Sequence, residues 1–184
     1  MTNGCEQRMS TTTDQATPER SAAEGSPEEP SSAASASEPS DGTERFLDSD
    51  LALQVHFLAS RARGRGISHA NRQLEGLDLK VRQFSVLSLA ASGMNPSQRE
   101  LGEFLSLDPS QIVALVDHLE KRGAVRRETD PRDRRSKIIV ATESGEDLHA
   151  QALKILTDSE DHTLSTLSPR ERKQLRSLLL KIAF

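Results

Sequence analysis

The chain has 184 residues, enough for one domain of ordinary size and a tail, and it carries a formal net charge of −4. Its single cysteine, Cys5, excludes an intramolecular disulfide framework and a cysteine-based zinc site. No apolar run approaches the roughly 20 residues that cross a bilayer, so we expect a soluble, cytoplasmic protein without a membrane partner.

The amino-terminal segment differs in composition from the rest of the chain. Residues 1–44 contain no Val, Ile, Leu, Phe, Trp or Tyr, and nine acidic residues against two arginines give them a net charge of −7. Such a segment cannot bury enough apolar area to offset its ordering entropy, so residues 1–45 are predicted to be a disordered acidic tail rich in Ser, Pro and Glu. Cys5 lies in this tail, and we interpret it as an incidental exposed thiol rather than a redox sensor. Because residues 45–184 carry +3, the acidic balance of the whole chain does not exclude a nucleic-acid partner.

Two helices are expected before residue 92. The first is predicted from Phe46 onward, since Leu51, Val55 and Leu58 recur at helical spacing. We expect it to be bent or weakened where it meets Gly64 and Gly66, because each helical glycine costs about 1 kcal/mol relative to alanine. Residues 79–91 are apolar on more than one side, which is typical of a central, buried helix.

The next two helices are marked by their first residues. After a turn at Asn95-Pro96, Ser97 lies three residues before Glu100, the spacing of a capping box. The following helix is expected to start with Asp108 as its N-cap, Pro109 in the first turn and Gln111 at the reciprocal capping position. The predicted buried stripes of the two helices are Leu101, Phe104 and Leu105 in the first, and Ile112, Leu115, Val116 and Leu119 in the second.

The hydrophobic period then changes from helical to alternating. Gly123 is predicted to end the helix in a left-handed conformation, and two strands follow at residues 125–129 and 137–142, joined by a charged hairpin loop at 130–136. Two helices close the chain, the first capped by Thr142 and the second by a capping box that starts at Ser168. Their apolar stripes are Leu148, Ala152, Ile155 and Leu156, and then Leu175, Leu178, Leu179 and Ile182.

This order of elements predicts an α+β, mostly α, fold: a winged helix-turn-helix. The second helix of such a unit enters the major groove of DNA with its amino-terminal residues. Gln111 has the amide that pairs with adenine, Ser110 reaches a base or a phosphate, and Val113 and Ala114 suit a thymine methyl. The alternative is a merely solvated helix face. Helical phase predicts six outward residues: Ser110, Gln111, Val113, Ala114, Asp117 and His118.

A run of positive charge favours the DNA-binding interpretation. Residues 121–137 hold eight Lys and Arg against three acidic residues. Arginines on a hairpin tip suit the minor groove, where the negative potential of DNA is focused. We also expect Asp133 to orient Arg135 by a charge-assisted hydrogen bond. The candidate contacts in this loop are Arg132, Asp133, Arg134 and Arg135.

The segment LGEFLSLDPSQIVALVDHLEKRGAVRRETDPRDRRSKIIVATESG resembles the core of the MarR (multiple-antibiotic-resistance regulator) family. The resemblance covers roughly residues 46–184. It implies a homodimer in which residues 46–79 and 143–184 form a helical dimerisation region, while residues 80–142 bind DNA. It also implies a pseudo-palindromic operator, and in many members repression that a small aromatic or anionic effector releases. The most specific matching positions are Leu119 with Gly123, then Asp130, Arg132, Asp133, Arg134 and Arg135, then Thr142 with Gly145.

The sequence also bears on two other functional classes, enzymes and protein–protein interaction modules. The sequence has no phosphate-binding glycine loop, nucleophile elbow or close metal-ligand cluster, so we expect neither an enzyme nor a bound cofactor or metal. The alternative to DNA binding is a winged-helix protein–protein interaction module, whose acidic tail binds a basic partner or competes with DNA for the basic loop. That module would not need the loop arginines, whereas DNA binding would.

Overall fold

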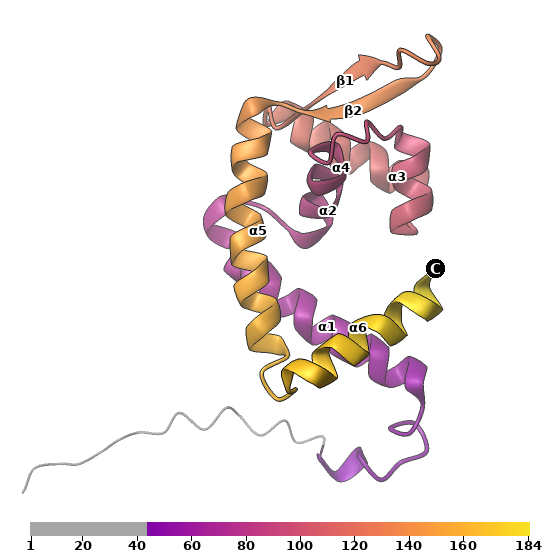
Figure 1. Cartoon of the computed structure of the whole chain (residues 1–184), viewed down its shortest axis with the longest axis vertical. Coiled ribbons are helices and arrows are strands. Elements are labelled where there is room, and N and C mark those ends of the chain that lie inside the picture. Colours follow the sequence, from indigo (N-terminus) through magenta and orange to yellow (C-terminus); the bar gives the residue numbers. More distant parts are fainter. Residues whose placement is uncertain (1–43) are drawn as a thin grey trace, which may run out of the picture. The chain divides into compact units, whose positions relative to one another are not determined.

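The computed structural model describes residues 44–184 (Figure 1). The predicted acidic tail at residues 1–45 lies outside this part except for its last two residues, and so does Cys5. None of the helices within residues 44–184 has the length and apolar character needed to cross a membrane. In chain order the elements are the 3-10 helix η1 (Glu44–Phe46), α1 (Val55–Gln73), the 3-10 helix η2 (Glu75–Leu77), α2 (Val81–Ala90), α3 (Gln98–Leu105), α4 (Pro109–Lys121), β1 (Val125–Thr129), β2 (Lys137–Ala141), α5 (Glu143–Thr163) and α6 (Pro169–Ala183).

Helix α1 corrects two expectations. It begins at Val55 rather than near Phe46, because turns occupy the chain between η1 and α1 and the apolar side chains there are exposed. It also runs unbroken through Gly64 and Gly66 to Gln73, so the predicted interruption is wrong. Packing of α1 against α5 offsets the intrinsic cost of the two glycines.

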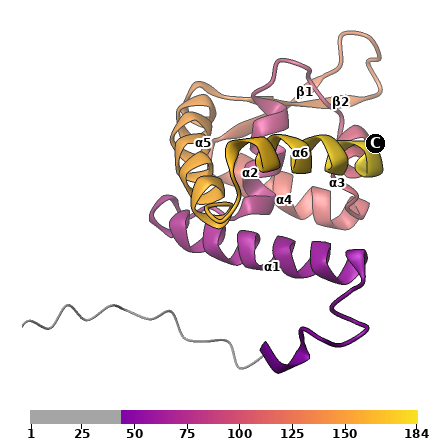
Figure 2. The ribbon, with the colours of Figure 1, turned by 60° about the horizontal axis from the view of Figure 1, so that its bottom comes forward.

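Helix α2 is central, as predicted. It contacts α1, α3, α4, α5 and β2, and its Val86, Leu87 and Ala90 are buried. The core that surrounds it is continuous from the helix-turn-helix to the first half of α5. In both Figure 1 and Figure 2 the β1–β2 wing lies at one end of this unit and α1 at the other.

The apolar stripe of α3 is narrower than predicted. Leu101 is fully buried and Leu105 is half-buried, but the side chain of Phe104 is exposed over 56% of its surface. At about 100° per residue, Phe104 lies roughly 60° from Leu101 around the helix, on the side away from Leu105. It therefore falls outside the core and stacks on Phe184, the last residue, with ring centroids 5.4 Å apart.

The four predicted N-cap residues all lie at the N-cap position, and three of them accept a hydrogen bond through their side chains. Ser97 and Glu100 make a reciprocal capping box, Ser168 and Glu171 make another, and Thr142 accepts a hydrogen bond from the backbone N–H of Gly145. The hydrogen bonds from Ser97 hold the pKa of Glu100 below its usual value. Asp108 is the N-cap residue of α4 and Pro109 lies in the first turn, as predicted, but the Asp108 carboxylate accepts no capping hydrogen bond.

The wing is a two-stranded antiparallel sheet that is tied to the start of α3. Val125 pairs with Ala141 at one end of the ladder and Thr129 pairs with Lys137 at the other. The backbone N–H of Ile139 donates to the carbonyl of Pro96 over 2.8 Å, and Ser97 forms a bridge with Ile138. The wing is therefore attached to the helix-turn-helix through its backbone as well as through the core.

A histidine pair links α1 to α5. The rings of His69 and His162 stack with their centroids 4.5 Å apart, and Nδ1 of His69 lies 2.8 Å from Oγ of the buried Ser159. Burial lowers the pKa of His69, and the neighbouring charges of His162 and Arg72 lower it further.

The lowered pKa predicts a weak acid sensitivity of this contact. Because the folded state disfavours protonated His69, its stabilising contribution is complete well above the ordinary histidine pKa of about 6.5 and is lost as pH falls below it. The variant H162Q removes one positive charge, so we expect the pKa of His69 to rise toward the ordinary value. An NMR titration of the His69 ring checks this, and an unchanged pKa in the variant would contradict it.

Candidate nucleic-acid interface

Helix α4 presents a polar and small-residue face to solvent. The connection from α3 is short because Ser106 adopts a left-handed conformation and the N–H of Leu107 turns back to the carbonyl of Gly102 over 3.0 Å. A side chain at Gly102 would lie 3.2 Å from the Leu107 carbonyl oxygen, which explains the glycine at this close approach. The helical phase is confirmed, since all six predicted outward residues are exposed and the inward ones are buried or half-buried.

The carboxyl end of α4 is held in place by its own basic residue. Gly123 adopts the predicted left-handed conformation, with φ of 74°. The guanidinium of Arg122 donates to the carbonyls of Leu77 (2.6 Å), the last residue of η2, and Asp78 (2.7 Å), which follows it. Arg122 is therefore a structural contact between α4 and the chain before α2.

Arg127 makes a second and larger set of contacts to α4. From β1 its guanidinium donates to the carboxylates of Asp117 and Glu120 and to Oε1 of Gln98, the last over 3.0 Å. Only 23% of its side chain is exposed. Burial alone would lower the pKa of Arg127, but the hydrogen bonds and charges of the two carboxylates raise it overall. The side chain thus joins β1, α3 and α4.

The wing loop is shaped by two aspartates. Asp130 is buried and accepts hydrogen bonds from the backbone N–H (2.8 Å) and the guanidinium (2.9–3.2 Å) of Arg132, which hold its pKa below the usual value. Asp133 accepts from the backbone N–H of Arg135 and from the hydroxyl of Ser136, both over 3.0 Å. The expected charge-assisted hydrogen bond between Asp133 and Arg135 is therefore present, and its donor is the backbone N–H of Arg135.

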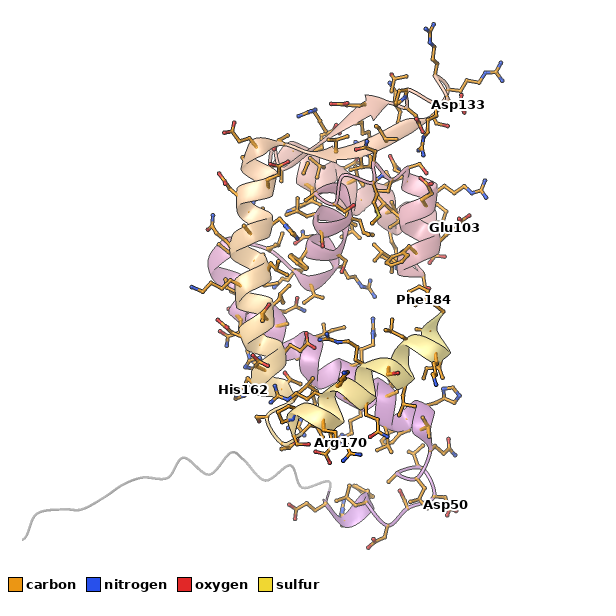
Figure 3. All side chains as sticks on the ribbon, in the orientation of Figure 1. Asp50, Glu103, Asp133, His162, Arg170 and Phe184 are labelled. Carbon is orange, nitrogen blue, oxygen red and sulfur yellow. The ribbon has the colours of Figure 1, made fainter. Side chains whose placement is uncertain are left out.

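Most of the basic residues near the wing are already engaged. Arg126 pairs with Glu128, and Nζ of Lys137 donates to Thr129 over 2.8 Å, in addition to the contacts of Arg122, Arg127 and Arg132. Within residues 44–184, Lys121, Arg134 and Arg135 are the members of the basic run whose side chains make no hydrogen bond or ion pair. Arg134 and Arg135 follow Asp133 at the exposed tip of the wing (Figure 3). The charge available to a ligand is thus concentrated at that tip.

A separate cavity lies between α1, α2 and α5. It has a volume of about 480 Å³ and is lined by apolar side chains that include Ile67, Phe84 and Leu156. Arg63 contributes the only cationic group among its lining residues. Phe84 in turn stacks on His149 with ring centroids 5.4 Å apart. Glu160 adds a carboxylate to the same lining, so the composition suits a flat, mainly apolar ligand.

Known proteins share both the sequence and the fold. The model of the MarR family matches residues 79–137. The HTH-type transcriptional regulator BilQ of Clostridium symbiosum is 31% identical over 110 residues, which cover 60% of this chain and 75% of that protein. A MarR-family transcriptional regulator from Rhodococcus sp. RHA1 has a TM-score of 0.70 and 38% identity, covering 74% of this chain and 96% of its own.

Two solved structures of proteins named CouR are also similar to this chain. CouR from Rhodococcus jostii RHA1, bound to p-coumaroyl-CoA, has a TM-score of 0.66 and 40% identity to this chain. The structure of the transcriptional repressor CouR bound to a 23-mer DNA duplex has a TM-score of 0.68 and 31% identity. Each covers 74% of this chain and 96% of the CouR chain.

Proposed function

Because this chain belongs to the MarR family of winged helix-turn-helix transcriptional regulators, which are not enzymes, we propose that it binds a pseudo-palindromic DNA operator as a cytoplasmic homodimer. The observation that carries this proposal is the pairing of an exposed α4 face with two unpaired arginines at the wing tip. The DNA complex of the similar protein CouR supports it.

In the proposed complex the two parts of the interface read different grooves. Gln111 and Ser110 meet base edges or phosphates in the major groove, and Val113 and Ala114 lie against thymine methyls. Arg134 and Arg135 enter the neighbouring minor groove. Arg132 and Asp133 act chiefly by shaping the wing through the contacts described above.

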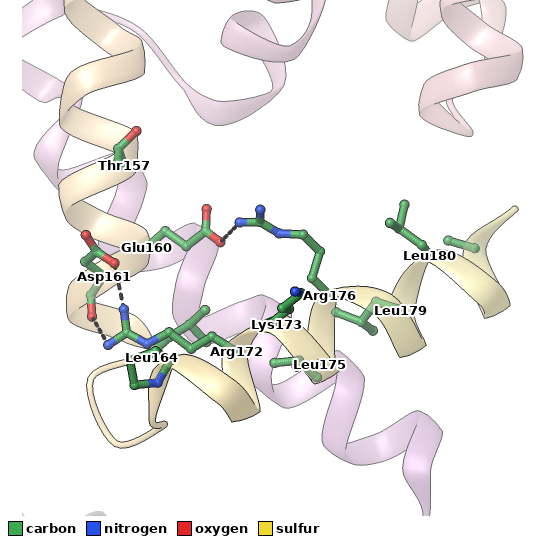
Figure 4. A pocket seen from close by; sticks show the side chains of 12 residues that line it. Thr157, Glu160, Asp161, Leu164, Arg172, Lys173, Leu175, Arg176, Leu179 and Leu180 are labelled. Carbon is green, nitrogen blue, oxygen red and sulfur yellow. Dashed lines mark hydrogen bonds and ion pairs between the residues drawn. The ribbon is translucent and has the colours of Figure 1, made fainter.

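The proposed dimer explains why so many apolar side chains are exposed. Ion pairs of Arg172 with Asp161 (2.7 Å) and Arg176 with Glu160 (3.6 Å) connect α6 to α5, beside an open cavity of about 570 Å³ (Figure 4). Leu179 nevertheless stays 45% exposed, and no residue of α6 is buried. In the proposed dimer, a second copy of this chain covers these side chains and the exposed apolar residues around η1 and the start of α1. The exposed set is Phe46, Leu47, Leu51, Leu53, Val55, Leu58, Leu178, Leu179, Leu180, Ile182 and Phe184.

A charge placed on this surface should separate the protomers. We expect wild type to elute as a dimer and the double variant L179E/I182E to be a monomer, because burying two carboxylates in an apolar interface is strongly unfavourable. Size-exclusion chromatography with light scattering measures the mass directly. The double variant M94E/V113E, which places two carboxylates at exposed apolar positions outside this set, is the matched control and should stay dimeric. A monomeric wild-type protein would contradict the proposal.

We further propose that the protein is a ligand-responsive repressor. CouR bound to p-coumaroyl-CoA supports an aromatic acid or its thioester as the class of effector. The cavity between α1, α2 and α5 would hold the aromatic part, and Arg63 would hold the negative charge. An effector that binds more tightly to a dimer whose α4 helices are not spaced to fit the two half-sites increases the population of that conformation. It thereby lowers the affinity for the operator.

The test is DNA binding measured by fluorescence anisotropy on the promoter region beside the protein's own gene. We expect specific binding that falls steeply as salt rises, since phosphate contacts release counterions. Addition of aromatic acids and their thioesters should lower the affinity. If the folded dimer shows no specific binding even at low salt, the protein–protein interaction module becomes the better interpretation.

A further inference from the structure

Helix α4 carries two carboxylates on the side of the molecule that would face DNA. Asp117 and Glu120 lie in its second half, and their side chains are 58% and 40% exposed. An unpaired carboxylate beside the phosphate backbone repels it, so a recognition helix with two of them is unfavourable unless they are neutralised. The contacts of Arg127 supply that neutralisation from within the protein.

We propose that Arg127 is a positioning residue for DNA recognition: it neutralises Asp117 and Glu120, draws both carboxylates toward β1, and makes no contact with DNA itself. This inference rests on the proposed function. Three features support it. The Arg127 side chain is mostly buried, each of its three guanidinium nitrogens donates to a different side chain, and its backbone N–H donates to Glu120 over 3.2 Å.

The positive charge of Arg127 is not available to DNA, although it belongs to the basic run at residues 121–137. Arg127 contributes to the net positive charge counted along the sequence, yet its charge is used to cancel acidic groups of the recognition helix. Its third partner, Gln98, is the first residue of α3, so the same side chain fixes the relation between the two helices and the wing. Loss of Arg127 therefore leaves two negative charges without a partner and removes one contact that joins β1, α3 and α4.

The experiment compares operator affinity across a salt series for wild type, R127Q, D117N/E120Q and the triple variant D117N/E120Q/R127Q. We expect R127Q to bind roughly tenfold more weakly, the scale of coupling within one hydrogen-bonded network. The triple variant should recover to within about threefold of wild type, since amide groups leave no charge to repel DNA. The deficit of R127Q should shrink as salt rises, because salt screens the repulsion between the exposed carboxylates and DNA, whereas the triple variant should keep the wild-type slope of log affinity against log salt.

Two results would overturn the inference. One is wild-type affinity in R127Q. The other is a weak triple variant, above all one whose salt slope drops by about 0.9, the value for one lost phosphate contact. The control R126Q makes the same change one residue earlier, where the arginine pairs only with the exposed Glu128, and it should stay close to wild type.

A measurement without DNA separates this inference from the proposed function. Thermal unfolding of the same four proteins gives the coupling between Arg127 and the two carboxylates, and we expect it to be favourable. If wild type binds no operator, the proposed function fails while the coupling is still measured. If wild type binds and R127Q binds equally well, the inference fails alone.

Discussion

The double variant R134A/R135A is expected to bind its operator about 100-fold more weakly than wild type at moderate salt. These two side chains are the exposed arginines of the wing tip that no internal contact engages. Because a dimer carries two wings, the variant removes four arginines from one complex. The salt dependence of binding should become shallower as well, since fewer counterions are released. Fluorescence anisotropy over a salt series measures both quantities.

The control for this variant is R170A, which removes the same side chain from the exposed start of α6. Figure 3 labels Asp133 at the wing tip and Arg170 near the opposite end of the described chain. We expect R170A to bind like wild type. Both variants should unfold within about 0.5 kcal/mol of wild type, as is usual for exposed positions. Equal affinity in R134A/R135A and wild type would show that the wing does not touch DNA.

The largest effect on stability is expected at Gly145. A Cβ at this position would lie 1.9 Å from the carbonyl oxygen of Ala124 and 2.8 Å from its carbonyl carbon, so the backbone itself must move. The clash falls at a dense junction, where Thr142 and Ser144 both donate to the carbonyl of Gly123. We expect G145A to lose about 3 kcal/mol of unfolding free energy, the upper end for overpacking. Thermal unfolding should show a Tm about 10 °C lower.

Gly64 provides a matched control, because the same substitution there is expected to raise the free energy of unfolding instead of lowering it. It lies within α1, and no heavy atom stands within 4 Å of the position that its Cβ would take. The variant G64A should therefore gain about 0.5–1 kcal/mol, because alanine loses less backbone entropy in a helix. A Tm for G145A equal to that of wild type would mean that the α5 junction relaxes freely and that the resemblance at this position has another cause.

Local signals predicted much of the fold. The capping boxes at Ser97 and Ser168, the cap at Thr142 and the left-handed Gly123 are set by residues within a few positions of one another, and all four are confirmed. Asp108 shows the limit of such signals, since a suitable residue type does not ensure that its side chain turns toward the helix. The predicted start of α1 was wrong because the exposed apolar residues before Val55 have the same spacing as a buried helical stripe.

The candidate site was predictable in outline but not in its internal contacts. Helical phase identified the exposed face of α4 because that face depends only on the position of the buried stripe. Counting charge along residues 121–137 could not show which arginines are engaged. Arg127 reaches Gln98, 29 positions earlier, and Arg122 reaches Asp78, 44 positions earlier. Partners at such distances are set by tertiary packing, which leaves no regular spacing in the sequence.

The length of α5 gives the proposed dimer a mechanical property. Its amino end is bonded to the end of α4 and to the wing through Gly123, and its other end leads into α6. With 21 residues, it is about 31 Å long at 1.5 Å per residue. A tilt of about 5° about the carboxyl end of α5 would displace the winged helix-turn-helix at its amino end by about 3 Å. This displacement is close to the rise of one base pair, about 3.4 Å. The helix thus acts as a lever arm. In the proposed dimer, a sub-ångström shift near its pivot would change the spacing of the two α4 helices enough to misalign them with the DNA grooves.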